Sequence, residues 1–226
     1  MDSVVISIGG SVLVPNENDA DYLKTLAGLL SRISSIHKLY IVTGGGRIAR
    51  YYITSGRVLG ASEKNLDEFG IEVTRLNARL LSTALGDLAN PKPALNIDEA
   101  TELGKNHQIV VMGGTEPGHT TDAVSAMLAD KIGAARLVNA TSVDGVYDSD
   151  PKKNKDAKRF KRVSHEELVA LTSEIKGMAG PTVIFDPKGS EIIKNAKIPL
   201  YVCHGRDLGA LENAVLGKDF DGTIVD

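Results

Sequence analysis

Near the start of the chain, residues 4–11 read VVISIGGS, from Val4 to Ser11: a run of β-branched residues that ends in two glycines. The arrangement returns twice, because Gly44-Gly45-Gly46 follows the apolar residues 39–42 and Gly113-Gly114 follows residues 108–112. Short continuous apolar runs bounded by glycine predict strands that are buried on both faces of a sheet. Each glycine cluster predicts a tight turn out of its strand.

Segments with helical periodicity separate these strands. Residues 19–36 and 65–88 each repeat apolar side chains every three or four positions. The first segment is interpreted as a helix that covers the sheet, and the stripe of the second is interpreted as core packing; it comprises Phe69, Val73, Leu76, Leu80 and Leu81. Further strands are predicted at residues 136–140 and 200–204, and a helix at 123–132. This alternation predicts an α/β fold with a mostly parallel sheet covered on both faces.

Composition excludes several classes of protein. The 226 residues are 42% hydrophobic and 24% charged, with a net charge of -3, so no nucleic-acid partner is predicted. No apolar stretch approaches the roughly 20 residues that cross a bilayer, so no membrane partner is predicted either. The N-terminus lacks a signal peptide pattern, and the single cysteine, Cys203, is interpreted as a buried strand thiol. Together they predict a cytoplasmic location.

The three glycine clusters are expected to meet in space, because the carboxyl ends of parallel strands share one edge of the sheet. Glycine has no Cβ, so phosphate oxygens can approach the amide N–H groups of such turns. A purely steric role in tight turns is the alternative, but three clusters at one edge favour a phosphate site. Neither GxxxxGK[ST] nor GxGxxG is present, which disfavours P-loop ATPases and dinucleotide-dependent dehydrogenases.

Two groups of polar side chains accompany the glycines. Arg47 and Arg50 fall in the first turn of the helix expected after the triple glycine, where a cation opposes the helix dipole unless an anion binds nearby. They are either phosphate ligands or surface arginines. Thr120 and Thr121 precede the helix at 123–132, either as plain N-caps or as ligands of an acceptor phosphate. Asp122 is suited to orienting donors or a metal ion.

Two other features are interpreted more plainly. His119 is interpreted as a loop contact, because no second histidine or cysteine stands at metal-ligand spacing. Residues 150–162, DPKKNKDAKRFKR, are basic and poor in apolar side chains, so they predict an exposed loop or short hairpin. A solvated loop is favoured there over direct contact with phosphate.

The stretch from Thr141 to Pro151, TSVDGVYDSDP, closely resembles the nucleotide-donor motif T-x-V-D-G-V-[YF]-x-x-D-P of the amino-acid kinase family. With IGGS at 8–11, GGGRIAR at 44–50 and GGTEPGHTTDA at 113–123, it resembles the archaeal-type uridylate kinase branch of that family. The four blocks occur in order between Val4 and Pro151, and residues 186–187 and 221–223 extend the resemblance nearly to the C-terminus.

The resemblance implies that residues 1–226 form one amino-acid-kinase-type domain, a three-layer αβα sandwich. Its N-terminal part would bind UMP and its C-terminal part ATP. It further implies transfer of the terminal phosphoryl group of Mg²⁺-bound ATP to UMP, giving UDP and ADP in pyrimidine nucleotide biosynthesis, and a homohexamer. No protein side chain is assigned to the metal.

The resemblance also assigns roles to individual residues. The catalytic residues would be Gly10, Arg50 and Asp122. The ATP-binding residues would be Ser7, Ile8, Gly9, Gly10, Ser11, Gly45, Arg50, Thr141, Ser142, Tyr147 and Asp150. The UMP-binding residues would be Gly44, Asp67, Thr115, Glu116, Pro117, Gly118, His119, Thr120 and Thr121.

One position departs from most branches of the family. They place a lysine two residues before the first glycine turn, where this chain has Ser7. The archaeal uridylate kinases also lack that lysine, so the departure agrees with the branch but leaves the neutralising cation unassigned. Lys188 is one choice, although it is equally interpreted as an exposed loop lysine.

Two alternatives remain open: a sister kinase that acts on an amino acid, carbamate or isopentenyl phosphate, and a non-catalytic binding protein. A sister kinase acting on isopentenyl phosphate should carry a histidine close behind the triple glycine, and residues 47–52, RIARYY, have none. Glutamate and aspartate kinases usually bring extra domains, for which 226 residues are too few. A protein of the same fold that stores molybdenum or tungsten binds ATP without being an enzyme, and release of ADP would separate that class from a kinase.

Overall fold

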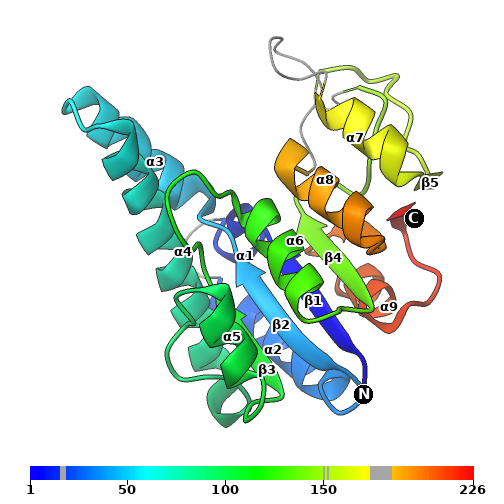
Figure 1. The fold of residues 1–226 in the computed structure, drawn as a ribbon, viewed down its shortest axis with the longest axis horizontal. Helices are drawn as coiled ribbons and strands as arrows, with labels where there is room; N and C mark the ends of the chain where they lie inside the picture. The colour runs from blue at the N-terminus through cyan, green and yellow to red at the C-terminus, as the bar shows by residue number, and fades with distance from the viewer. Residues whose placement is uncertain (16–18, 150, 152, 174–184) are drawn as a thin grey trace.

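The computed structural model describes residues 1–15, 19–149, 151, 153–173 and 185–226 (Figure 1). Its elements are, in chain order, β1 (Ser3–Ile8), α1 (Gly10–Leu13), α2 (Ala20–Ile33), β2 (Lys38–Thr43), α3 (Gly46–Val58), α4 (Glu63–Leu85), the 3₁₀ turn η1 (Gly86–Leu88), α5 (Ile97–Leu103), β3 (Ile109–Met112), α6 (Thr121–Lys131), β4 (Arg136–Thr141), β5 (Arg162–Val163), α7 (His165–Ser173), α8 (Pro187–Ala196), β6 (Leu200–His204), α9 (Leu208–Leu216) and β7 (Gly222–Val225).

The described strands form one sheet in the order β3-β2-β1-β4-β6-β7-β5. The five strands predicted from the sequence, β1, β2, β3, β4 and β6, all run parallel, which confirms the predicted fold class. β7 pairs antiparallel with β6 and was not predicted, because it is a four-residue strand that begins at a glycine. The chain leaves β1 toward β2 and later returns to β4 on its other side, so the order of strands reverses between β1 and β4.

Alternate side chains of each strand serve two separate cores. Val4, Ile6 and Ile8 pack with α2, α4 and α9, whereas Val5 packs with α5, α6, α7 and α8. Figure 1 shows the sheet between these two helical layers, which is the αβα sandwich. Both faces of β1 are therefore buried, in agreement with its mostly apolar sequence, in which Ser7 is the polar residue nearest the site. Cys203 lies in this interior in β6, where burial raises the pKa of its thiol to about 12.

The long helix α4 agrees with the sequence in its position but not in all of its packing. The Ser62 side chain caps its first turn by accepting from Asn65 N, and Gly86, with φ of +59°, ends it. Val73 and Leu81 are buried as expected, but Leu76 is 64% exposed and Phe69 and Leu80 also face solvent. The prediction that the whole stripe is core packing is therefore wrong, because periodicity alone does not show which helix faces have a partner.

The basic segment after β4 folds back on itself. Tyr147 and Arg159 form an antiparallel bridge, and Phe160 N donates to Val146 O at 2.9 Å. The described part of this segment is therefore the short hairpin that was one of the two predicted forms. Residues 150 and 152 lie outside the described part.

Candidate active site

The first two glycine clusters touch each other where β1 and β2 end. Gly44 N donates to Ile8 O at 2.8 Å, and a Cβ on Gly10 would lie 2.5 Å from Gly44 O and closer still to Gly46 N. Gly46 has a φ of +62°, which few residues with a side chain adopt. The close approach of these two turns therefore depends on glycine at both positions 10 and 46.

The third cluster reaches the same edge through side chains of α4. Gly114 N donates to Thr74 Oγ1 at 2.6 Å, and Asn77 Nδ2 donates to Gly44 O at 2.8 Å. A Cβ on Gly113 would lie 2.6 Å from Thr74 Oγ1. The predicted convergence of all three clusters is confirmed, and α4 is the element that joins the second cluster to the third.

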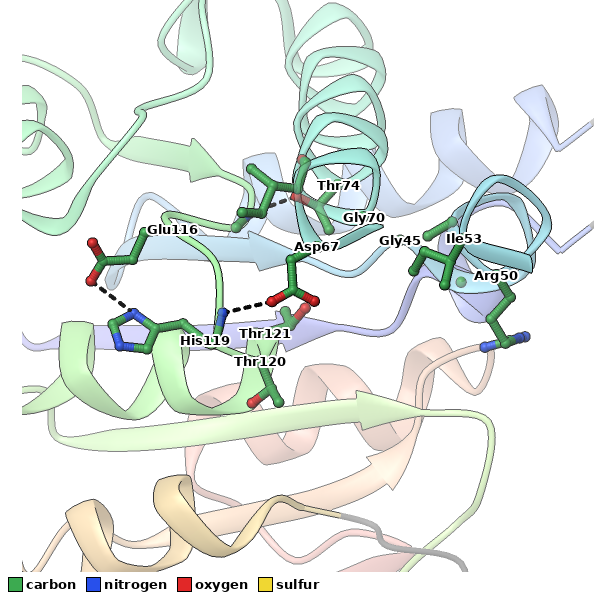
Figure 2. A pocket seen from close by; sticks show the side chains of 15 residues that line it. Gly45, Arg50, Ile53, Asp67, Gly70, Thr74, Glu116, His119, Thr120 and Thr121 are labelled. Atoms are coloured by element: carbon green, nitrogen blue, oxygen red, sulfur yellow. Dashed lines mark hydrogen bonds and ion pairs between the residues drawn. The ribbon is translucent and has the colours of Figure 1, made fainter. Parts of the chain in front are cut away.

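Two cavities open at this edge, and we call them the β1 cavity and the α4 cavity. The β1 cavity, of about 340 Å³, lies at the strand ends of β1 and β4, where the order of strands reverses. The α4 cavity, of about 440 Å³, lies between α3, α4 and the loop before α6 (Figure 2). Both are bordered by the same five residues, which form their shared wall: Gly45, Gly46, Arg50, Thr120 and Thr121.

The shared wall is where two helices begin. Helix α3 starts at Gly46, and α6 starts at Thr121 behind Thr120, whose hydroxyl accepts from Ala123 N at 3.1 Å. Unpaired amide N–H groups and the positive ends of the two helix dipoles favour an anion at such a place. Arg50 adds a guanidinium that donates to Ser11 Oγ at 3.2 Å, so the wall is suited to phosphate.

Asp122 brings a carboxylate into the β1 cavity from the first turn of α6. Burial, together with the nearby charge of Asp186, raises the pKa of this carboxyl from its ordinary value of 3.8 to about 7, and a hydrogen bond from the Ser7 side chain offsets part of that rise. Asp122 is therefore a carboxylate whose negative charge costs free energy until a cation approaches it.

Asp186 joins the two halves of the chain at this point. It caps α8, accepting from Gly189 N at 2.7 Å, and its other oxygen accepts from Thr120 Oγ1 and from Ala123 N at 3.1 Å. The start of α6 is thus held by a residue that is 66 positions away from Thr120. The sequence indicates only the local role of Asp186, because Asp186-Pro187 is an N-cap followed by proline at the first helical position of α8.

The floor of the β1 cavity is braced from the C-terminal half of the chain. Arg206 Nε donates to Val12 O at 3.2 Å, and its Nη2 donates to Asp19 Oδ1 at 2.7 Å. The guanidinium lies 4.3 Å from the centroid of the Tyr22 ring, and Tyr22 OH donates to Gly205 O at 2.7 Å. These contacts hold α1, and with it the turn at Gly9 and Gly10, against the end of β6.

The α4 cavity is lined by a different chemistry. Asp67, on α4, accepts from Gly118 N at 2.9 Å, and Figure 2 shows this bond crossing the cavity to the loop before α6. On the same loop, His119 Nδ1 lies 3.4 Å from Glu116 Oε1. Ile53 and Ile71 add apolar surface. A carboxylate, polar loop atoms and an apolar wall are suited to a ligand with hydroxyls and a ring.

Comparisons of the sequence and of the fold with known proteins point to one protein family. The model of the "Amino acid kinase family" matches residues 2–204. The chain belongs to the amino acid kinase family. Uridylate kinases of Methanoculleus marisnigri and Thermoplasma volcanium are 45% and 46% identical to it, over 100% and 96% of this chain and 96% and 94% of theirs. The crystal structure of uridylate kinase from Archaeoglobus fulgidus matches with a TM-score of 0.89 and 42% identity, covering 100% of both chains.

Most residues that the amino acid kinase resemblance assigned to a site do line the two cavities. On the β1 cavity lie Ser7, Gly9, Gly10, Ser11, Gly44, Gly45, Arg50, Asp122, Thr141 and Ser142. On the α4 cavity lie Asp67, Glu116, Gly118 and His119, with Thr120 and Thr121 on the shared wall. Gly44, which the resemblance assigned to UMP, lies on the β1 cavity beside residues that it assigned to ATP.

The remaining assigned residues lie elsewhere. Ile8 is buried in β1, and Thr115 lines a neighbouring cavity of about 280 Å³ that also borders Glu116 and His119. Pro117 lines none of the cavities described here. Asp150 falls outside the described residues. Lys188 is exposed in the first turn of α8 and borders neither cavity.

Tyr147 lies in the donor motif of the amino acid kinases but outside both cavities. Its OH donates to Asp144 Oδ1 at 2.8 Å, and Arg159 Nη1 lies 2.5 Å from Asp144 Oδ2. Burial opposes ionisation of Asp144, but its hydrogen bonds and the Arg159 charge outweigh burial and lower its pKa. Tyr147 is therefore held by a hydrogen bond to Asp144, which forms an ion pair with Arg159.

Several lining residues carry no motif signal of their own. Thr74, Ile53 and Ile71 come from the middle of helices, and Asn139 comes from β4, where its Cα pairs with that of Ser7. Only the sheet register and the contact of α3 with α4 bring them to the site. Among the described residues, no group of three or more His, Cys, Asp or Glu side chains is arranged to hold a metal ion.

Proposed function

We propose that this protein is a uridylate kinase that transfers the terminal phosphoryl group of ATP to UMP, giving UDP and ADP for pyrimidine nucleotide synthesis. The observation that carries the proposal is the pair of cavities with one shared wall, because a phosphoryl transfer needs two phosphate-bearing ligands to meet end to end. The names of the full-length relatives support UMP as the acceptor.

In this proposal ATP binds in the β1 cavity and UMP in the α4 cavity. The glycine turns and Thr141 border the first cavity, and Asp67 borders the second, where its carboxylate can accept hydrogen bonds from a ribose. The γ-phosphorus of ATP and the phosphate of UMP then meet at Gly45, Gly46, Thr120 and Thr121. One oxygen of the UMP phosphate bonds to the γ-phosphorus while the bond to the β–γ bridging oxygen breaks, so ADP leaves with that oxygen.

The chain's own groups position the phosphates rather than attack them. Main-chain N–H groups at the starts of α3 and α6 and the Arg50 guanidinium are placed to stabilise negative charge on the phosphoryl group in flight. Asp122 does not need to be a nucleophile, because the acceptor is already a phosphate. We propose that it orients the cation that accompanies ATP.

Mg²⁺ is the cofactor that this chemistry implies. The residues fit an ion held mainly by ATP phosphates, since Asp122 supplies a carboxylate next to Asp186 whose charge is unfavourable without a cation. When bound, Mg²⁺ neutralises charge on the transferred phosphate. The protein's part is to hold the Asp122 carboxylate at the start of α6, with Ser7 donating to it.

The direct test is turnover with a panel of nucleoside monophosphates. We expect purified protein with ATP and Mg²⁺ to convert UMP to UDP with release of one ADP, and to act far more slowly on AMP and GMP, as measured by ion-exchange separation of the nucleotides. Absence of UDP, or comparable turnover with AMP, contradicts the proposal. Binding of ATP without release of ADP would instead indicate a storage protein.

We also propose that copies of the chain associate, with the homohexamer as the predicted form. Of the eleven exposed large apolar side chains among the described residues, nine lie between Tyr51 and Leu95, mainly on α3 and α4. In Figure 1 these two helices project from the sandwich side by side. Exposed apolar side chains concentrated on two neighbouring helices favour an interface there.

Charge placed on this face should dissociate the assembly. We expect Leu76→Glu with Leu80→Glu to give a smaller species in sedimentation velocity, because a carboxylate is costly to bury at an apolar contact. Ile36→Glu is the control, since Ile36 is 56% exposed and lies after α2, away from this face. A monomeric wild-type protein, or an unchanged size in the double variant, contradicts this interface.

None of the described helices combines the length and the apolar character needed to cross a membrane. Cys203 is buried and unpaired, so the chain has no disulfide that would require an oxidising compartment. On this basis we propose a cytoplasmic location, which fractionation of cells that express a tagged chain would test.

A further inference from the structure

We infer that Arg75, on α4, is a positioning residue that sets the acceptor loop, residues 113–119, and so controls the affinity for UMP but not for ATP. The inference deepens the proposed function and rests on it. Arg75 borders neither cavity, so it acts through the loop and not by contact with substrate.

The guanidinium of Arg75 is bonded entirely to main-chain carbonyls. Nε donates to Gly114 O at 3.1 Å, and Nη2 donates to Thr115 O at 3.0 Å and to Leu95 O at 3.3 Å. The structure gives it no ion pair with a described carboxylate. The half-buried guanidinium donates to three carbonyls and thereby fixes the path of the two loops that carry them. A planar guanidinium suits this role better than an ammonium, because its N–H groups point in fixed directions.

The loop that Arg75 holds is the one that shapes the α4 cavity. Four residues of the loop border that cavity: Gly114, Glu116, Gly118 and His119. Arg75 contacts the carbonyls of Gly114 and Thr115, which lie at the start of this stretch. Thr74, the preceding residue, bonds to Gly114 N at 2.6 Å. Both the N–H and the C=O of Gly114 are therefore bonded to adjacent residues of one helix.

The donor side does not depend on Arg75. Asn77, two residues along α4, is the α4 side chain that bonds to the triple-glycine turn. The first glycine turn is braced instead through Arg206 and Val12. Loss of the Arg75 fork should therefore loosen the acceptor loop while the turns around ATP keep their supports.

Arg79 provides a matched control. It lies one turn further along the same helix and is exposed, and its side chain has no hydrogen bond or ion pair with the described residues. Arg75→Met and Arg79→Met remove the same charge from the same helix and keep most of the aliphatic stem. Any difference between them reports on the three carbonyl bonds rather than on charge.

The experiment measures KM for UMP, KM for ATP and kcat for wild type, Arg75→Met, Arg75→Lys and Arg79→Met, together with thermal unfolding. We expect Arg75→Met to raise KM for UMP about tenfold, with KM for ATP within about twofold of wild type. Arg75→Lys should fall between the two, because an ammonium can keep one carbonyl bond but not the fork. Arg79→Met should match wild type.

Each other outcome is decisive. Equal KM values for UMP in Arg75→Met and Arg79→Met overturn the inference, and so does a rise in both KM values by the same factor, which would indicate general loosening. If Arg75→Met is too unstable to assay, Arg75→Lys carries the same comparison with Arg79→Met. A wild-type protein that does not use UMP contradicts the proposed function itself, whereas a wild type that does, with no effect at Arg75, contradicts the inference alone.

Discussion

The two cavities are built in different ways, although they share a wall. The loop before α6, which borders the α4 cavity, is held by one continuous helix, whose residues Asp67, Thr74 and Arg75 all bond to main-chain atoms of that loop. The β1 cavity is assembled from turns that are distant in the chain and braced by Arg206. One helix therefore sets the acceptor side, whereas the donor side depends on contacts between the two ends of the chain.

The largest effect is expected where the two cavities meet. Gly10→Ala should lower kcat/KM for both substrates by at least about 100-fold, because its Cβ would be forced into the backbone of Gly44 and Gly46 and displace the shared wall. Steady-state assays with each substrate varied in turn would measure this. Gly28→Ala is the control: Gly28 is exposed within α2 with open space where a Cβ would lie, so alanine should leave activity intact and add about 0.5–1 kcal/mol of stability. A Gly10→Ala enzyme of normal activity would contradict the contact between the turns.

Asp122→Asn should separate activity from stability. We expect kcat to fall by about 100-fold, because the amide cannot orient a cation as the carboxylate does. The folded state holds the Asp122 proton up to a pKa of about 7, whereas the unfolded chain releases it near 3.8, so wild type loses stability as the pH rises between those values.

The asparagine variant lacks this titration. Its melting temperature should therefore exceed that of wild type at pH 8, and the gain should shrink toward pH 4. Thermal unfolding at several pH values, in the absence of metal and nucleotide, would measure the difference. A gain that does not depend on pH, or that grows toward low pH, contradicts the raised pKa of Asp122.

Asp67→Asn tests the acceptor side alone. Its carboxylate accepts from Gly118 N and faces the cavity proposed for UMP, so we expect KM for UMP to rise about tenfold with KM for ATP unchanged. Glu68→Gln, a neutralisation at the next position, which is exposed, is the control. If KM for ATP rises in Asp67→Asn while that for UMP does not, the assignment of the two cavities is reversed.

The smallest effect is expected on the donor side. Arg206→Met should raise KM for ATP about threefold and leave KM for UMP unchanged, because the brace on α1 includes one partly solvent-accessible ion pair. Arg32→Met, which removes an exposed arginine from α2, should change neither value. An effect of Arg206→Met on UMP rather than ATP would show that the brace does not serve the β1 cavity.

The sequence was sufficient for the five parallel strands β1, β2, β3, β4 and β6 and for the meeting of the glycine turns, since apolar strands and parallel topology together place those turns at one edge. It was not sufficient for Asp186, because a bond to Thr120 across 66 residues leaves no local pattern. Nor did it reveal the brace at Arg206, which depends on how the turn after β6 packs against α1. The exposed side of α4 was misjudged for the opposite reason. Its apolar side chains do repeat with helical periodicity, but this periodicity does not distinguish a face that packs in the core from one that faces solvent.

The shared wall has a consequence for ligands that are not substrates. A single molecule in which adenosine and uridine are joined by a polyphosphate chain could place one end in each cavity. Besides Arg50, the wall between the two cavities consists of glycine backbone and short hydroxyl side chains. Once one end is bound, the tether keeps the other at a high effective concentration beside its own cavity, without any new contact. Such a compound would compete with both natural ligands at once. The polyphosphate length that gives the tightest binding would measure the distance between the two nucleoside sites.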